Sequence, residues 1–461
     1  MTAPDVIATI LRAVLAAGIV LTLVPLTVWL ERKGAAYIQD RPGPNRAAAF
    51  GIFRLGGVTH VVADAIKLIA KEDLMPAHVN PFYWKLAPML VGMIPLLTFA
   101  IIPMADDFRV GSFVTPMALL LLDAGLLWFF AITSLAVYGV VFAGWSSGNK
   151  YSLLGGVRST AQLLSYEIPM AIAAICVILT FGTVQPNEIV RMQGELLFGF
   201  IPQWGVVLQP LAAIVFLTCA FAEINRVPFD LAESEAELVA GYHTEYSGMR
   251  FGTFFLAEYM ALIVSGALSV TLFFGGWQVP FLPTERLVSG AATLLPAFLG
   301  LGAVVCGLLG WLGYRHYQTY AKGRWNDRRD FEPLILGSLM FALAMVQLVL
   351  AGAAWGARDG LAAWIPPLFA TVIQLSAFVA KLCFFCWVFV WVRWSLPRFR
   401  YDQLLNLGWK ALLPISLLNL LLTGVLLSLA SLPPSTTTWI VLGMGILAGS
   451  LLVWTFRRQT A

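Results

Sequence analysis

The sequence of 461 residues is 59% hydrophobic and only 12% charged, and its mean hydropathy of +0.81 excludes a soluble protein, because no soluble core needs so much apolar surface. The net charge of +4 is spread along the chain and indicates no nucleic-acid partner. The five cysteines are scattered and form neither a disulfide framework nor a metal-ligand cluster.

Apolar runs long enough to cross about 30 Å of hydrocarbon as helices recur along the whole chain. They predict an all-α polytopic membrane protein with about eleven spans in a single membrane domain, 1–461. The N-terminal stretch MTAPDVIATILRAV lacks the basic region and cleavage site of a signal peptide, so we expect the first run to stay in the membrane. The runs are 13–30, 86–104, 115–145, 161–182, 204–224, 251–274, 288–313, 334–356, 366–392, 411–430 and 439–456.

The distribution of basic residues favours one orientation of these spans. If the odd-numbered connections face the cytoplasm, they carry 23 of the 29 Lys and Arg residues, while the opposite side carries five and Lys381 lies within a span. The positive-inside rule therefore predicts an outside N-terminus and a cytoplasmic C-terminus.

The first cytoplasmic segment contains an amphipathic pattern directly after a polar stretch. The stretch ERKGAAYIQDRPGPN combines charges and helix breakers beneath the first span, which suits a polar mouth where an amphipathic, lipid-soluble ligand could enter. The pattern that follows predicts a helix lying at the membrane surface, either as a plain anchor or as the border of a site. Its apolar face holds Val58, Val61, Val62, Ala65, Ile66 and Ile69, and its polar face holds His60, Asp64, Lys67 and Lys71.

Only five formal charges lie inside the predicted spans. Each is costly in lipid unless it faces protein, water or a partner, so each is a candidate functional residue. Closely spaced carboxylates in a low dielectric share and exchange protons, so the acids outline a proton path that starts at the cytoplasm. The five are Asp123, Glu167, Glu223, Glu258 and Lys381.

Two of these charges also have a simpler explanation. Glu223 could pair with Arg226 one turn later, at the membrane surface. Lys381 could extend its long side chain towards the cytoplasm.

The stretch FDLAESEAELVAGYHTEYSGMR, at 229–250, is unusually acidic for a loop between two apolar spans. Asp230 could cap a helix that begins at Leu231, with Glu233 completing a capping box. Capping does not account for Glu235, Glu237 or the following YHTEY. We therefore predict a functional acidic cluster in this loop.

Long motifs resemble the H subunit of the proton-pumping NADH-quinone oxidoreductases, respiratory complex I. The resemblance covers roughly 10–282 and 366–430, and motifs of this length are far more specific than a short glycine pattern. The motifs are ERKGAAYIQDRPGPNR, ADAIKLIAKEDLMP, GWSSGNKYSLLGGVRSTAQLLSYEIPM, FAEINRVPFDLAESEAELVAGYHTEYSGMRFGTFFLAEY and WVRWSLPRFRYDQLLNLGWKALLP.

The resemblance implies that the chain forms much of the quinone chamber, whose entrance lies between the first span, the amphipathic helix and the sixth span. It also implies that the chain begins the polar path to the proton-pumping subunits. The residues implied at the chamber are Glu31, Arg32, Arg41, Asp64 and Lys67. Those implied in the proton path and in the acidic loop that couples it to the chamber are Glu167, Glu223, Glu233, Glu235, Glu237, Glu258 and Arg393.

The same resemblance implies the setting of the protein. The chain would bind no cofactor itself, quinone (ubiquinone in many members) would be the substrate, and iron–sulfur clusters and flavin would belong to partner subunits of the membrane and peripheral arms. It would lie in the inner membrane of a bacterium. The alternatives are the equivalent subunit of a membrane-bound hydrogenase or of a dehydrogenase with another electron donor, and a secondary transporter, for which inverted repeats would be expected.

The sequence departs from the family pattern in four places. The segment 47–62 is several residues longer than usual, and Ser134 stands where some members have an acid, which Asp123 could replace only through bridging water. A two-helix hairpin, 283–365, separates the family core at 1–282 from that at 366–430, and 431–461 adds a final helix. The hairpin spans contain no charge, so we expect the hairpin at the periphery, against lipid or a neighbouring subunit.

Overall fold

The computed structural model describes residues 3–197, 199–230, 239–322, 328–358 and 360–428. Within these ranges, nine helices are long and apolar enough to cross a membrane, and a tenth apolar helix, α8, is shorter. The prediction of an all-α polytopic membrane protein is confirmed. The predicted span 439–456 lies outside the described residues.

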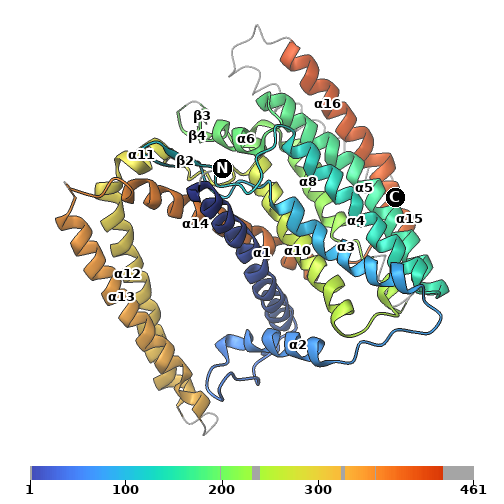
Figure 1. Ribbon diagram of the computed structural model, residues 1–461, viewed down its shortest axis with the longest axis horizontal. Helices are drawn as coiled ribbons and strands as arrows, with labels where there is room; N and C mark the ends of the chain where they lie inside the picture. The colour runs from blue at the N-terminus through green and yellow to red at the C-terminus, as the bar shows by residue number, and fades with distance from the viewer. Residues whose placement is uncertain (1–2, 198, 231–238, 323–327, 359, 429–461) are drawn as a thin grey trace.

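The ten apolar helices follow the predicted order along the chain (Figure 1). They are α1 (Ala3–Ile38), α3 (Pro81–Phe99), α4 (Gly125–Ser146), α5 (Lys150–Phe181), α8 (Pro210–Glu223), α10 (Gly248–Phe273), α12 (Ala291–His316), α13 (Glu332–Gly356), α14 (Ile365–Ser395) and α16 (Leu413–Ser428).

Shorter elements connect these helices. Two antiparallel strand pairs lie in connections, and the remaining elements are helical. The strand pairs are β1 (Phe108–Val110) with β2 (Phe113–Thr115), and β3 (Leu196–Leu197) with β4 (Ile201–Pro202). The helical elements are η1 (Leu55–Gly57), α2 (Thr59–Ala70), α6 (Pro186–Met192), α7 (Gly205–Leu208), η2 (Gly241–His243), α11 (Thr284–Ser289), η3 (Tyr317–Ala321), η4 (Arg328–Phe331), α15 (Tyr401–Asn406) and η5 (Leu407–Leu412).

Two predicted spans differ from the helices that form. The span predicted at 115–145 becomes helical only at Gly125, because its first residue, Thr115, ends β2 and the residues 116–124 run irregularly. The span predicted at 204–224 is broken at Gln209, whose φ of −133° and ψ of 62° leave the helical region. Pro210 follows directly, and a proline disfavours helical geometry in the residue before it.

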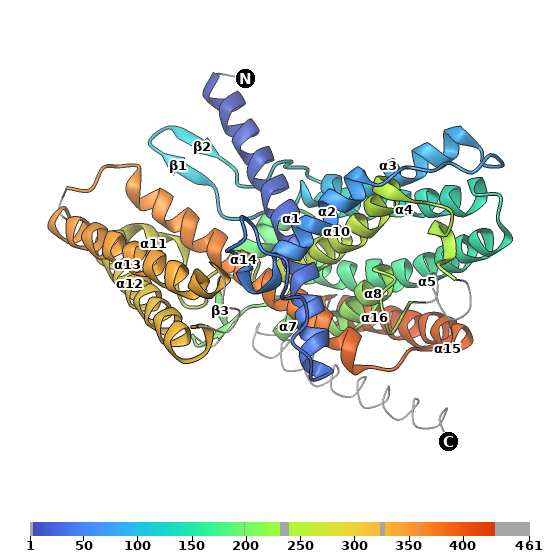
Figure 2. The same ribbon diagram turned by 90° about the horizontal axis from the view of Figure 1, so that it is seen from below.

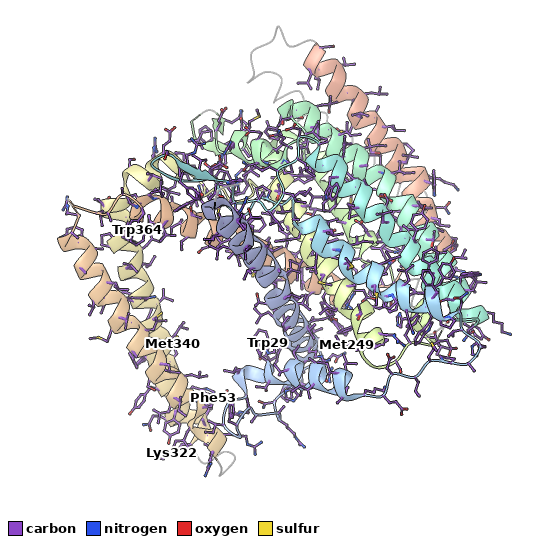
Figure 3. All side chains as sticks on the ribbon, in the orientation of Figure 1. Trp29, Phe53, Met249, Lys322, Met340 and Trp364 are labelled. Carbon is purple, nitrogen blue, oxygen red and sulfur yellow. The ribbon has the colours of Figure 1, made fainter. Side chains whose placement is uncertain are left out.

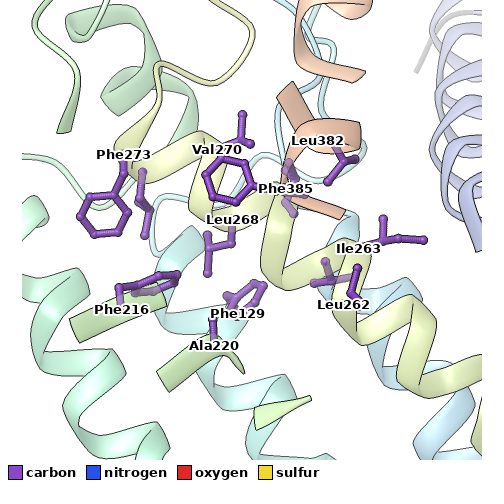
Figure 4. Packing of buried hydrophobic residues seen from close by; sticks show 14 of the residues in the cluster. Phe129, Phe216, Ala220, Leu262, Ile263, Leu268, Val270, Phe273, Leu382 and Phe385 are labelled. Carbon is purple, nitrogen blue, oxygen red and sulfur yellow. The ribbon is translucent and has the colours of Figure 1, made fainter. Parts of the chain in front are cut away.

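Helix α10 is the centre of the main bundle (Figures 1 and 2). It packs against α3, α8, α14 and α1, and 78% of the residues in its most apolar stretch are buried. Figure 4 shows Phe129 of α4, Phe216 of α8 and Phe385 of α14 gathered around Leu268 of α10. Close packing of these side chains fixes the relative positions of the helices that carry the acids.

Helices α12 and α13 form a hairpin at the edge of the molecule, beside α14 (Figure 1). Their backbones approach closely, since a Cβ atom at Gly310 would lie 3.0 Å from the carbonyl oxygen of Gly337. In the most apolar stretch of each helix, only 11% of the residues are buried. The hairpin therefore presents a long apolar surface, as Leu308 and Val349 illustrate with exposures of 56% and 68%.

Contacts between connections agree with the predicted alternation of the spans. The amide N–H of Phe399 donates to the carbonyl of Pro228 over 3.2 Å, and Arg398 pairs with Asp230. Both connections were expected on the cytoplasmic side, and they lie together. The inserted hairpin therefore leaves the connection after α14 at the same end of the bundle as the connection after α8.

Candidate functional site

A buried group of charges joins four separate parts of the chain. Glu31 near the end of α1 accepts a hydrogen bond from the hydroxyl of Tyr259 over 2.9 Å and pairs with Arg226 over 3.3 Å. Arg393 near the end of α14 also pairs with Glu31, and Arg226 pairs with Glu258 of α10 over 2.9 Å. We call these five residues the ion cluster.

The ion cluster balances its charges while excluding most water. The side chains of Glu31, Arg226 and Glu258 are only 10 to 12% exposed, so their ionised forms depend on one another rather than on solvent. The guanidinium of Arg226 also lies 4.1 Å from the ring centroid of Tyr259, where a cation gains from the negative face of the ring. A change in charge at one member must therefore alter the pairing of the others.

Glu258 also faces a cavity inside the bundle. The cavity has a volume of about 90 Å³, which is room for several water molecules. Its lining is largely apolar, but it contains the carboxylates of Glu167, Glu223 and Glu258 together with Thr133 and Asn225. Three of the predicted path residues are thus brought together from α5, α8 and α10, and Glu258 connects them to the ion cluster.

Ser134 lies within α4 as expected, whereas Asp123 does not. The hydroxyl of Ser134 donates a hydrogen bond directly to Glu167, so α4 still supplies a polar partner to the cavity. Asp123 lies before α4 begins, is exposed, and accepts a hydrogen bond from Gln185 over 2.7 Å. The prediction of Asp123 as a charge inside a span was wrong, because the span starts later than its apolar composition indicated.

The simpler explanations for Glu223 and Lys381 are also wrong. Arg226 pairs with Glu31 and Glu258 rather than with Glu223. The ammonium of Lys381 donates to the carbonyls of Phe274, Gly276 and Gln278 over 2.7 to 3.0 Å. These carbonyls follow the end of α10 opposite the ion cluster, so Lys381 extends away from the predicted cytoplasmic side.

A second polar group lies where α1 meets α2. Arg32 of α1 pairs with Asp64 of α2, and Lys67 lies 3.7 Å from the same carboxylate. Arg41 stays apart from this group, since its guanidinium donates to Gln39 over 2.9 Å in an exposed position. Four of the five predicted chamber residues therefore belong to two groups at this end of α1, and Arg41 belongs to neither.

The apolar face of α2 is not covered by the described part of the chain. Val62, Ile66 and Ile69 are 56 to 69% exposed, and α2 has no buried residue. A helix with this surface suits the membrane interface. The predicted amphipathic helix is confirmed, and it begins at Thr59.

The predicted acidic loop is described only at its ends. Glu233, Glu235 and Glu237, and the helix expected from Leu231, lie outside the described residues. Before them, burial raises the pKa of Asp230, and the neighbouring Arg398 only partly opposes this. This carboxylate therefore takes up a proton more readily than an exposed aspartate would.

Beyond the described gap, the YHTEY stretch packs into the protein. The ring of Tyr246 stacks on that of Trp84, with 4.8 Å between the ring centroids. The Tyr246 hydroxyl donates to the Trp84 carbonyl over 3.2 Å. Glu245 accepts a hydrogen bond from Asn149 over 2.7 Å. This end of the loop is thereby fixed against α3 and the start of α5.

Sequence reasoning did not identify Arg226 and Tyr259 as members of a site. Arg226 is the single base in the connection after α8, and Tyr259 follows Glu258 directly. A base between two spans that each contain an acid could have indicated an ion pair. Its partner Glu31, however, lies 195 residues away in the sequence. The two meet at Tyr259 of α10, which contacts both of them where α1 packs against α10.

Comparisons with known proteins agree with one another. The NADH dehydrogenase family matches residues 11–424. The chain is 39% identical to the NADH-quinone oxidoreductase subunit designated H 1 of Solibacter usitatus over 425 residues, which cover 91% of this chain and 96% of that protein. It is 36% identical to the H subunit of Bdellovibrio bacteriovorus, covering 89% and 93%, and 38% identical to subunit 8 of Rhodothermus marinus, covering 92% and 98%.

Proposed function

This chain belongs to the NADH dehydrogenase family, as a multi-pass membrane subunit of a proton-translocating NADH-quinone oxidoreductase, and from that premise we propose that it forms much of the quinone chamber and the first part of the proton path. Its partners include the other subunits of that complex. The chain binds no redox cofactor in this proposal. Flavin and iron–sulfur clusters in partner subunits supply the electrons, and quinone is the substrate.

One observation carries the proposal. Glu258 pairs with Arg226 in the ion cluster and also lines the cavity that contains Glu223 and Glu167. A continuous set of polar groups therefore runs from the end of α1 into the middle of the bundle. Such a set is costly in a membrane protein and is expected where protons or charged groups must pass.

The entrance of the chamber follows from α1 and α2. Asp64 and Lys67 lie on one face of α2, where Asp64 pairs with Arg32. The other face carries the exposed apolar side chains of Ile66 and Ile69. A polar head group can meet the charges there while an apolar tail stays in lipid. Quinone has both parts, so it fits this surface.

The coupling step follows from the balance of charge in the ion cluster. Quinone reduction consumes protons, and negative charge develops transiently near the chamber before they arrive. Arg226 and Arg393 are drawn towards that charge, which weakens the pairing of Arg226 with Glu258. The Glu258 carboxylate then takes up a proton, since an unpaired buried carboxylate is more stable in its neutral form. The proton passes through the cavity to Glu223 and Glu167.

The setting of the chain completes the proposal. The protein lies in the inner membrane of a bacterium with its N-terminus outside and its C-terminus in the cytoplasm, because the basic connections then face inwards. The acidic loop at 231–238 connects the chamber to the membrane path through Glu233, Glu235 and Glu237.

Photolabelling of the purified, assembled complex with a photoreactive quinone tests the chamber. We expect labelled peptides from 31–41 and 58–71 of this chain, and excess quinone should compete with the label. Asp64→Asn should lower the labelling, because it removes the charge that orders Arg32, whereas the exposed control Asp402→Asn should not. Labelling confined to other subunits, or to α12 and α13, would contradict the proposal.

A further inference from the structure

The hairpin of α12 and α13 is attached to the segment that leads into α2. The carboxylate of Glu332, the first residue of α13, accepts hydrogen bonds from the amide N–H groups of Arg54 and Leu55 over 2.8 and 2.5 Å. It also pairs with the Arg54 guanidinium over 2.9 Å. Both side chains are largely buried, at 7 and 12% exposure, so the pairing is well shielded from water.

The segment held in this way has a backbone that needs support. Leu55 has a φ of 47° and Phe50 a φ of 53°, which L-residues with side chains rarely adopt. Such conformations persist where neighbouring groups hold them. Glu332 binds the N–H of Leu55 itself, so it acts at one of the two strained positions.

The contact continues directly into α2. The hydroxyl of Thr59, the first residue of α2, donates to the carbonyls of Arg54 and Ala47 over 3.1 and 2.7 Å. The indole N–H of Trp29 on α1 donates to the carbonyl of Gly56 over 3.0 Å. The segment is thus fixed by α1 on one side and by the hairpin on the other.

The hairpin and this segment also line a common cavity. This open cavity of about 460 Å³ lies between them, lined by Arg54, Glu332, His316 and Leu312 among others. Figure 3 shows Phe53 of the segment close to the part of the hairpin between Met340 and Lys322. Arg54 and Glu332 both line this cavity, and their ion pair joins its two sides.

We propose that Glu332 is a positioning residue and that the hairpin holds α2 in place from outside the main bundle. The groups positioned through α2 are Asp64 and Lys67, which face Arg32 of α1. The anchoring follows from the structure alone. Its consequence for quinone rests on the proposed function, in which α1 and α2 border the entrance: the hairpin sets how readily quinone enters.

Hydrogen exchange in the assembled complex tests the anchoring. Glu332→Ala removes the acceptor of two amide N–H groups, so exchange of the peptide 47–58 should become roughly tenfold faster. Glu332→Gln keeps one acceptor oxygen and removes the ion pair, so its effect on exchange should be intermediate. This variant also tests the anchoring if the complex with Glu332→Ala does not assemble. Glu285→Gln, an exposed acid in α11 at the other end of the inserted region, is the matched control and should leave this exchange unchanged.

Steady-state kinetics test the consequence. A positioning role predicts that the Glu332 variants raise the KM for a long-chain quinone about threefold to tenfold, with kcat nearly unchanged, because access is altered and the reacting groups are not. A fall in kcat at unchanged KM, or faster exchange with unchanged KM, would overturn the effect on entry. Unchanged exchange in both variants would overturn the anchoring. Failure of the proposed function appears separately, as absent photolabelling in the unsubstituted complex.

Discussion

Arg226 is the residue on which the ion cluster depends most. It contacts both buried carboxylates, Glu31 and Glu258, and the ring of Tyr259. Arginine suits this position better than lysine, because its planar group reaches two acids at once and remains charged when buried. Glu258 was predictable as a costly charge inside a span and Glu31 from the family resemblance, whereas their common partner was not predictable.

Arg226→Met should reduce the amount of assembled complex. It leaves two carboxylates buried without their shared partner, and breaking a buried pair in this way costs about 3 to 5 kcal/mol. The measurement is the yield and thermal stability of the complex in mutant membranes, compared with those of Arg398→Met, which removes a more exposed base.

The triple variant Arg226→Met, Glu31→Gln, Glu258→Gln separates charge from packing. If unpaired charge causes the loss, neutralising both acids should restore much of the assembled complex. Yields that stay as low as in the single variant would show that Arg226 acts through its shape instead.

Among the elements, those with a strong local pattern were predictable. The apolar runs gave the membrane helices, and the apolar period from Val58 to Ile69 gave α2. The late start of α4 was not predictable, because the irregular stretch 116–124 that precedes it is largely apolar. The proline itself indicated the break before Pro210, but hydropathy alone does not take account of proline.

The contact between the two inserted elements was not predictable from a local pattern either. The lengthened segment 47–62 and the hairpin 283–365 are separate departures from the family pattern, yet Arg54 and Glu332 join them. These residues lie 278 positions apart, and no local pattern relates them. The hairpin is peripheral as expected, but its attachment near α2 was not foreseen.

The orientation of the helices after the hairpin gives an element-scale prediction. Two inserted spans reverse the chain twice, so the connection containing Gln403 should face the cytoplasm. A cysteine placed at this exposed position should react with an impermeant reagent in inverted vesicles and not in right-side-out cells. A cysteine at exposed Arg109, on the predicted outer side, should show the opposite result. Reaction of the Gln403 cysteine only from outside would contradict the assigned topology.

Across the whole molecule, the helices that form the buried core also carry the residues of the proposed site. α10 contributes most to the buried core and also carries Glu258 and Tyr259. The sequence identified Glu167, Glu223 and Glu258 as candidate residues, because charge in lipid is conspicuous. It could not show that Glu167, Glu223 and Glu258 share a cavity, since that depends on how α5, α8 and α10 pack.

The central claim is that quinone chemistry and proton movement are coupled through Glu258. Glu258→Gln keeps the size of the side chain and most of its hydrogen bonding but removes the proton that the carboxylate would exchange. Because the chemistry cannot run ahead of the proton step in a coupled chain, both activities should fall together.

The most direct measurement is quinone-reductase activity and proton pumping per assembled complex in Glu258→Gln membranes. We predict normal assembly with both activities lowered in parallel. Wild-type values for both would show that Glu258 is not part of the path, and a loss of pumping alone would show that coupling does not pass through this residue.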